Sequence, residues 1–299
     1  MIIDCHTHLN NYDPNHPDTL AERIARIEAA MARSGTDHAI VLTSFTQGPD
    51  RPSTREVVEA LEGNPRLSVV AGVSFQNYKQ RDLWELADFL EAGRIRGLKL
   101  YPGYEPFYPH DPRMRVVYEL AGEYEVPVMI HTGDTWNPKA KIKFAHPLQV
   151  DEVAVDFPEV KFVICHLGNP WFRDCMEVVY KNKNVYADFS GLALGDFSTR
   201  FQRYLKQQLD EFLLYAGEPR WLLYGTDWPI GSMRSYVSFM NALKMPQRDK
   251  NRILYENTAE LFRIPLPAQP PAPPEPPPAE TVENAPAPRE PEVERKTAR

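Results

Sequence analysis

The sequence has few cysteines, no long apolar run and no cluster of basic residues. Its three cysteines are too few, and odd in number, for a disulfide framework. No apolar run approaches the roughly 18 residues that a membrane span needs, and the first residues lack the basic-then-apolar pattern of a signal peptide. With a formal net charge of -7, nucleic acid is not expected as the main partner. These absences predict a cytoplasmic protein with reduced thiols that binds neither membrane nor nucleic acid.

Proline is concentrated at one end of the chain. Residues 265–299 hold 12 of the 29 prolines, interspersed with alanine and glutamate. Such a composition cannot bury enough apolar surface to offset the entropy of ordering the chain. We therefore expect a folded domain over residues 1–264 and a disordered tail with polyproline character over residues 265–299. We favour a solvated extension, with a docking segment for a proline-recognising partner as the alternative.

Short apolar runs alternate with helical patterns along the folded part. The runs resemble parallel strands that are covered on both faces. Eight strands with intervening helices match the size and order of an α/β fold, the closed (β/α)8 TIM barrel, and an open doubly wound sheet is the alternative. The strands are predicted at the opening of the chain and at residues 39–42, 67–74, 95–101, 126–131, 160–166, 184–189 and 221–227. The helices are predicted at residues 17–34, 53–61, 83–90, 111–124, 150–157, 200–215, 236–243 and 247–262.

Polar side chains stand where these strands end. In extended backbone His6 and His8 share one face, with roughly 6–7 Å between their Cα atoms at about 3.3 Å of rise per residue. The carboxyl ends of barrel strands meet on one face, so the strand-end residues can supply three or four ligands to a divalent ion and leave a position for water. Asp227 can hold that water and accept its proton. The strand-end residues are His6, His8, Lys99, His131, His166 and Asp227.

Several motifs around these residues resemble one known family. They are His6-Thr7-His8, Gly97-Leu98-Lys99-Leu100-Tyr101-Pro102, Ile130-His131-Thr132-Gly133, Cys165-His166-Leu167-Gly168 and Tyr224-Gly225-Thr226-Asp227-Trp228-Pro229. Together they resemble the amidohydrolase superfamily. Within it they are most similar to the amidohydrolase-related branch, which includes aminocarboxymuconate semialdehyde decarboxylase and the resorcylate decarboxylases. The resemblance covers roughly residues 1–264.

The resemblance implies roles for the strand-end residues. His166 would be a catalytic acid/base or a ligand of a second ion. In members with two metals a carboxylated lysine at the position of Lys99 bridges the ions, whereas in single-metal members the residue there faces the substrate. We favour one metal, with Lys99 contacting substrate. The implied metal ligands are His6, His8, His131 and Asp227.

The ion is expected to be Zn²⁺, with Mn²⁺, Fe²⁺ or Co²⁺ as alternatives. Aromatic side chains that follow strand ends are predicted to line a pocket for a planar small-molecule substrate. Those assigned to substrate binding are Tyr101, Trp171 and Trp228. The sequence leaves the oligomeric state open, including a homo-oligomer.

The leading functional hypothesis is a metal-dependent hydrolase, in which activated water attacks an amide, lactone or ester bond and Asp227 is the general base. The alternative is a metal-dependent, non-oxidative decarboxylase of an aromatic or muconate-like carboxylate, in which His166 handles the proton. A phosphoesterase ranks third, because its relatives usually place a glutamate where Lys99 stands. A metal-binding scaffold that works through the proline-rich tail is the non-enzymatic alternative.

Overall fold

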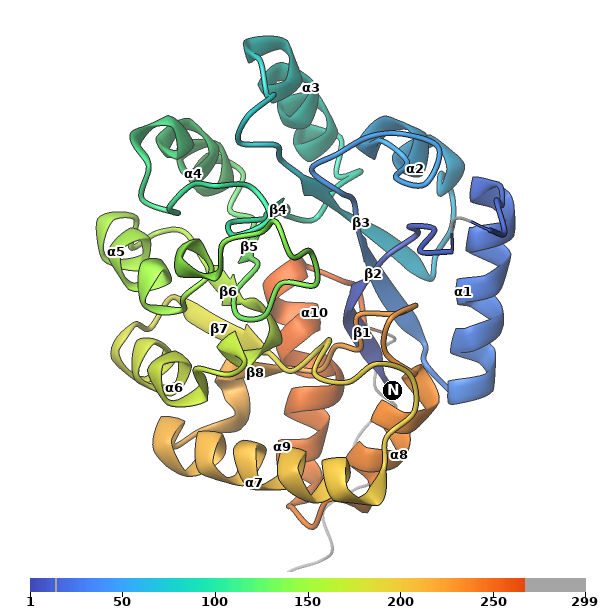
Figure 1. Ribbon diagram of the computed structural model, residues 1–299, viewed down its shortest axis with the longest axis vertical. Coiled ribbons are helices and arrows are strands. Elements are labelled where there is room, and N and C mark those ends of the chain that lie inside the picture. The colour runs from blue at the N-terminus through green and yellow to red at the C-terminus, as the bar shows by residue number, and fades with distance from the viewer. Residues whose placement is uncertain (14, 267–299) are drawn as a thin grey trace, which may run out of the picture. The chain divides into compact units, whose positions relative to one another are not determined.

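Eight parallel strands form the centre of the molecule in the computed structural model, which describes residues 1–13 and 15–266. Their order in the sheet is their order in the chain (Figure 1). The predicted tail lies outside the described residues. The strands are β1 (Ile3–Thr7), β2 (His38–Leu42), β3 (Leu67–Gly72), β4 (Leu98–Leu100), β5 (Val128–Ile130), β6 (Phe162–Ile164), β7 (Val185–Asp188) and β8 (Leu222–Leu223).

The sheet closes between its first strand and the segment that follows its last. Backbone N–H groups of Cys5 and His8 donate to the carbonyls of Tyr224 and Trp228 over 3.0 and 2.7 Å. The N–H of Asp227 donates back to the carbonyl of His6 over 2.8 Å. These bonds confirm the predicted (β/α)8 barrel, and the open doubly wound sheet is not formed.

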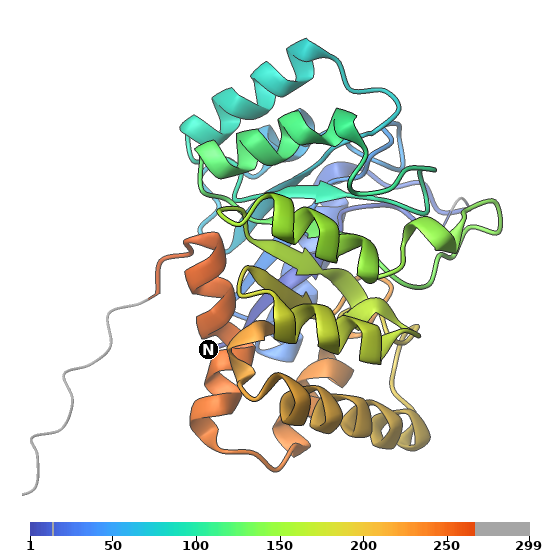
Figure 2. The ribbon, with the colours of Figure 1, turned by 90° about the vertical axis from the view of Figure 1, so that its left-hand side faces the viewer.

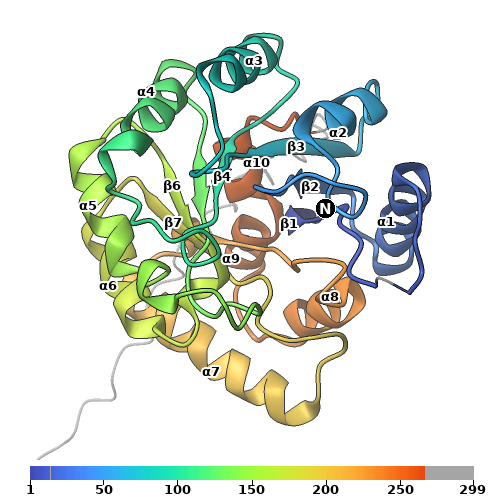
Figure 3. The same ribbon diagram turned by 45° about the horizontal axis from the view of Figure 1, so that its top comes forward.

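Helices surround the barrel, and Figure 3 shows them as an outer ring. Figure 2 shows the strand arrows of the barrel pointing the same way, so the loops that follow the strands gather at one end. This end, the mouth, is where we expected the polar residues. The helices are α1 (Leu20–Ser34), α2 (Thr54–Ala60), α3 (Gln80–Glu91), α4 (Arg115–Glu123), α5 (Leu148–Asp156), α6 (Phe172–Lys181), α7 (Thr199–Ala216), α8 (Met233–Ala242), α9 (Gln247–Asn251) and α10 (Asn257–Phe262).

Two helices illustrate how far local sequence decides the elements. The predicted capping box before α2 is confirmed, since the Ser53 hydroxyl accepts from the N–H of Glu56 and the Glu56 carboxylate accepts from the N–H of Ser53. The sequence analysis predicted no helix between the sixth and seventh strands, and this was wrong. Helix α6 fills that place, and it buries a stripe that begins at Phe172 and Cys175.

The barrel interior below the mouth is lined mainly by apolar side chains. Side chains of alternate strand residues fill it, and α10 lies against β1 and β8 at the opposite end, where Phe262 is buried. All three cysteines are free and buried. None of the helices in the described ranges is long and apolar enough to cross a membrane. The interior side chains are Ile3, Cys5, Ile40, Leu42, Val70, Met129, Val163, Cys165 and Leu223.

A buried histidine at the start of β2 makes stability depend on pH. Burial, with a smaller contribution from the nearby Arg96 and Arg66, lowers the pKa of His38 from 6.5 to about 4. Between these two pH values the unfolded chain binds a proton that the folded chain does not, so stability falls as the pH falls. We expect His38→Gln to show a smaller loss of urea midpoint than the wild type between pH 6.5 and 4, both measured with chelator present.

Exposed His16 provides the matched control, because its side chain is 83% exposed. His16→Gln should keep the wild-type pH slope. Equal slopes for His38→Gln and the wild type would contradict the assignment to His38.

Candidate active site

Three donor groups converge where the barrel closes. One ligand atom from each of His6, His8 and Asp227 lies within 4.8 Å of the other two. The Asp227 Oδ1 atom is 3.2 Å from His8 Nε2 and 3.8 Å from His6 Nε2. Asp227 has a positive φ of 60°, which turns the chain directly after β8 and places the carboxylate beside both imidazoles. The sequence-predicted convergence of β1 and the end of β8 is therefore present.

The hydrogen bonds of the two imidazoles decide which nitrogens face the carboxylate as acceptors. His8 Nδ1 donates to the carbonyl of Leu42 over 2.8 Å, and His6 Nδ1 donates to the Asp188 carboxylate over 3.0 Å. In each neutral ring the proton is on Nδ1, so Nε2 presents a lone pair. Asp227 Oδ1 is buried and has no hydrogen-bond partner among the residues that the structure describes. Lone pairs of two nitrogens and one oxygen thus face a common point, which fits a divalent cation.

Burial keeps these groups in their ligand forms. It lowers the pKa of His6 to about 4 and lowers that of His131 well below its ordinary value, and Lys99 adds to both effects. Burial works to raise the pKa of Asp227, but His8 and His6 face the carboxylate and hold its pKa below the ordinary value. The imidazoles of His6 and His131 are therefore neutral and the Asp227 carboxylate is ionised at neutral pH, as metal binding requires.

His131 and His166 lie beside the three-donor group. The ring centroid of His166 is 4.9 Å from that of His6 and 5.1 Å from that of His131. His131 Nε2 donates to the carbonyl of Asp134, which leaves Nδ1 as its acceptor. His166 Nδ1 donates to the carbonyl of Ser190, which leaves Nε2. Among the described residues, His131 has no ring nitrogen within 4.8 Å of the ligand atoms of all three donors, so its role as a further metal ligand stays a prediction.

Asp188 and Ser190 were missed by the sequence analysis. Asp188, at the end of β7, accepts from His6 Nδ1 over 3.0 Å and from the backbone N–H of His166 over 3.1 Å. The Ser190 hydroxyl donates to Asp188 and lies 3.0 Å from Nδ1 of both His6 and His166. Asp188 closes an apolar strand just as Asp227 does, so the strand-end rule would have found it. These two residues fix the orientation of His6 and His166.

Gly191 shows how tightly the site is packed. Its φ is +62°, and a Cβ atom there would stand 2.7 Å from both Asp227 Oδ2 and His166 Nδ1. A side chain at this position would displace the carboxylate and the imidazole together. The turn after β7 thus requires glycine for two reasons, its backbone conformation and the space it leaves.

Lys99 lies deeper than expected. Its side chain is 1% exposed, and its Nζ donates to Cys165 Sγ over 2.7 Å in the barrel interior. As a middle residue of β4 it points inward, because its neighbours Leu98 and Leu100 pack against the outer helices. This position favours an internal role over the predicted contact with substrate.

Aromatic side chains surround the mouth. The Tyr104 ring centroid lies 4.8 Å from His131 and 6.3 Å from Phe45, and Phe45 lies 5.0 Å from Tyr101. The Tyr101 hydroxyl donates to the carbonyl of Thr43 over 2.5 Å, which fixes its ring. These rings form one wall beside the histidines, and the contact of Tyr101 with substrate stays a prediction. Phe45 was not assigned to the site by the sequence analysis.

Trp171 and Trp228, the other predicted pocket residues, are both half-buried. Trp171 packs against His146, with 4.6 Å between ring centroids. Trp228 follows Asp227 directly, and its carbonyl accepts from the backbone of His8 at the barrel seam. Their contact with substrate stays a prediction.

A family model described as amidohydrolase matches residues 3–264. The chain belongs to the amidohydrolase family. A divalent metal is typical of this family, and the converging donors of this amidohydrolase agree with that property. The resemblance seen in the sequence is therefore confirmed.

One curated relative and two solved structures show what the chain is similar to. Gamma-resorcylate decarboxylase from Rhodococcus jostii (strain RHA1) is 23% identical over an alignment of 194 residues. The alignment covers 54% of this chain and 57% of the relative's length. A dihydroxybenzoic acid decarboxylase from Polaromonas sp. JS666, solved with manganese and the inhibitor 2-nitroresorcinol, is 14% identical with a TM-score of 0.65, covering 88% of this chain and 96% of that one. A probable 2-pyrone-4,6-dicarboxylic acid hydrolase from Acinetobacter baumannii, solved with citric acid, is 16% identical with a TM-score of 0.62, covering 88% and 99%. At these identities the two structures show a shared fold.

Proposed function

We propose that this amidohydrolase is a metal-dependent decarboxylase of an aromatic or muconate-like carboxylate. The observation that carries the proposal is the position of His166, whose ring lies within 5.1 Å of both His6 and His131 beside the three-donor group. Two of the three relatives described above are decarboxylases of hydroxylated benzoates. The sequence analysis placed hydrolysis first, and these relatives favour its alternative instead.

The metal-binding residues proposed are those that the sequence motifs implied. Zn²⁺ is the ion expected from two or three imidazoles and one carboxylate, and Mn²⁺ is the alternative that the Polaromonas enzyme suggests. When bound, the metal neutralises the substrate carboxylate and holds it in place. The proposed ligands are His6, His8, His131 and Asp227.

His166 is proposed to handle the proton. Loss of carbon dioxide leaves an electron pair on the ring carbon, and a proton has to be delivered to that carbon. The Nδ1–H of His166 is held by the Ser190 carbonyl, so Nε2 is the nitrogen available for the transfer. Nε2 would take up a proton from solvent water and deliver it to the ring carbon as the bond to the carboxylate breaks and carbon dioxide leaves. The wall formed by Phe45, Tyr101 and Tyr104 suits a planar ring beside it. The proposed partner is thus a small molecule, and nucleic acid has no proposed role.

Hydrolysis remains a second candidate on the strength of Asp227. Its Oδ1 atom is buried without a hydrogen-bond partner, so it can accept a proton from an attacking water. One of the similar structures is a probable lactone-type hydrolase of a pyrone dicarboxylate. Product analysis separates the two reactions, because only decarboxylation releases carbon dioxide.

We expect the metal-loaded protein to release carbon dioxide from a member of a panel of hydroxylated benzoates and muconates. In D₂O, deuterium should appear on the carbon that carried the carboxylate. Chelation should abolish turnover and added metal should restore it. His166→Gln should retain its metal and lose about 10²–10⁴-fold in kcat, the usual range for a positioned acid or base.

His16→Gln is the matched control, because the His16 side chain is 83% exposed and its contact is with Asp13. Its kcat should stay near that of the wild type. Lactone opening with water incorporation and no carbon dioxide would instead establish hydrolysis. Full turnover of the metal-free protein would contradict both candidates.

A further inference from the structure

The first strand of the barrel is irregular just where it reaches the donor group. Asp4 lies opposite Ala39 of β2, and Thr7 lies opposite Val41. β1 therefore advances by three residues where β2 advances by two, which is the pattern of a β-bulge. The extra residue lies between Asp4 and Thr7, in the stretch that contains His6.

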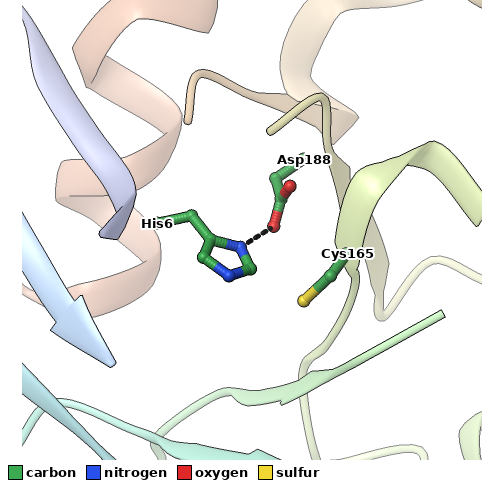
Figure 4. Close-up of side chains that lie close together, drawn as sticks. All are labelled: His6, Cys165 and Asp188. Carbon is green, nitrogen blue, oxygen red and sulfur yellow. Dashed lines mark hydrogen bonds and ion pairs between the residues drawn. The ribbon is translucent and has the colours of Figure 1, made fainter. Parts of the chain in front are cut away.

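The bulge changes the direction in which His6 faces. Ile3 and Cys5 fill the barrel interior. In a regular strand successive side chains alternate between the two faces, so His6 would point outward to the helices, on the same face as Asp4. Its imidazole instead points into the barrel, where Figure 4 shows it directed toward Asp188.

His8 depends on the same bulge. It follows His6 by two residues and therefore shares its face. Its Nε2 lies 3.2 Å from Asp227 Oδ1 at the mouth. A slip of one residue moves every later side chain of a strand to the opposite face, so a strand without the bulge would turn both imidazoles away from Asp227.

The Asp4 carboxylate accepts hydrogen bonds from both sides of the barrel seam. Its Oδ1 accepts from the backbone N–H of His6 over 3.1 Å and from that of Thr226 over 3.0 Å. Its Oδ2 accepts from the Thr226 hydroxyl over 2.6 Å, and this hydroxyl accepts from the N–H of Trp228 over 3.2 Å. Asp4 and Thr226 are fully buried, so water does not replace these bonds.

One side chain thus holds the backbone at His6 and, through Thr226, the backbone on either side of Asp227. We propose that Asp4 is a positioning residue for the metal site at the mouth, an inference that rests on the proposed function. Asp4 holds the bulge that turns the two histidines into the barrel and fixes the segment that carries Asp227 beside them. The role requires its acceptor atoms and not its charge, because its partners are two N–H groups and a hydroxyl.

The test compares Asp4→Ala, which removes the acceptors, with Asp4→Asn, which keeps an oxygen for both N–H groups. The dissociation constant for Co²⁺ is measured, and the d–d absorption bands are recorded at saturating Co²⁺. Asp4→Ala should bind Co²⁺ at least about 10-fold more weakly, the lower end of the usual effect of outer-shell partners. Its bands at saturation should differ from those of the wild type, and Asp4→Asn should restore them.

A second readout needs no metal. In chelated protein labelled with [¹⁵N]histidine, the Nδ1–H of His6 should give a protected resonance, because it donates to buried Asp188 over 3.0 Å. We expect the resonance in the wild type and in Asp4→Asn, and its loss in Asp4→Ala. If the wild type bound no Co²⁺, the proposed function would fail, and this resonance would still decide whether Asp4 directs His6.

Asn184→Ala is the matched control for lost stability. Asn184 is buried before β7, at the end of the barrel opposite the mouth, and its amide donates to the carbonyls of Ala154, Phe157 and Val160. This variant should be less stable than the wild type and keep both the Co²⁺ bands and the His6 resonance.

Wild-type bands and a protected His6 resonance in folded Asp4→Ala would overturn the proposal, as would loss of both in Asp4→Asn. Where Asp4→Ala does not fold, Thr226→Val takes its place, because it removes the bond to Asp4 Oδ2 and the acceptor of the Trp228 N–H. Weaker Co²⁺ binding by Thr226→Val is then expected, and unchanged affinity would refute the role of the bridge.

Discussion

Asp227→Asn is expected to fold normally and to lose its metal ion. The amide nitrogen of asparagine can donate to His8 Nε2, which lies 3.2 Å from the present Oδ1 atom. In the wild type His8 Nε2 faces the Asp227 carboxylate oxygen, and both atoms are acceptors. In the variant, the asparagine N–H gives His8 Nε2 a hydrogen-bond donor. The substitution also removes the anionic ligand that a divalent ion needs. Elemental analysis should find about one ion per wild-type chain and almost none in the variant, with activity lowered by at least about 10²-fold.

Thermal unfolding gives an independent readout of the same substitution. Added metal should raise the melting temperature of the wild type and leave that of Asp227→Asn unchanged, because ligand binding stabilises only a state that binds it. In chelator the variant should melt no lower than the wild type. Asp134→Asn is the matched control, since it removes the charge of an exposed carboxylate while the Asp134 carbonyl still accepts from His131. Full metal content in Asp227→Asn would show that the ion binds elsewhere.

Asp188→Asn is expected to weaken metal binding and turnover together. Asp188 accepts from donors on three residues, His6, His166 and Ser190. An asparagine presents N–H where one of these donors now finds an oxygen, so His6 or His166 loses its orientation. Loss of a carboxylate that orients a metal-bound histidine typically lowers metal affinity by about 10–100-fold. The dissociation constant, from competition with a chelator, and kcat at saturating metal should both change.

Ser190→Ala tests whether the effect belongs to the carboxylate. It removes one hydroxyl and keeps the Ser190 carbonyl that holds His166, so metal affinity should fall less than in Asp188→Asn. A kcat defect that persists at saturating metal separates misplacement of His166 from simple metal loss. Unchanged metal affinity in Asp188→Asn would refute the orienting role.

The barrel and the convergence of three donors were predictable because both follow from local pattern and strand direction. Apolar runs marked all eight strands, and the rule that parallel strands end on one face brought His6, His8 and Asp227 together. The length of the folded part and the number of its strands also favoured the closed barrel over the open doubly wound sheet. Helix α6 escaped detection because its stripe follows directly on the strained turn at His166 and Leu167, where φ is positive.

The depth of a side chain and the tautomer of a ring could not be read from the sequence. Lys99 was placed at the mouth because it lies near the end of the predicted strand 95–101, yet it is buried and its amine donates to Cys165 Sγ inside the barrel. The tautomers of His6 and His8 depend on Asp188 and the Leu42 carbonyl, which come from other strands. Such contacts arise only from the three-dimensional pairing of the strands, including the register shift within β1.

The seam of the barrel gives the donor group at the mouth a mechanical role. His6 and His8 stand on its first side and Asp227 on its second. The two sides are otherwise joined by backbone hydrogen bonds and by the Asp4 carboxylate, which accepts from the N–H and hydroxyl of Thr226. An ion held by all three would join β1 to the segment that follows β8 and so stabilise the closure of the barrel. Amide protons at the seam between β1 and the segment after β8 should then exchange with solvent more slowly when the ion is present. The exchange rates of the β4 and β5 amides should stay unchanged.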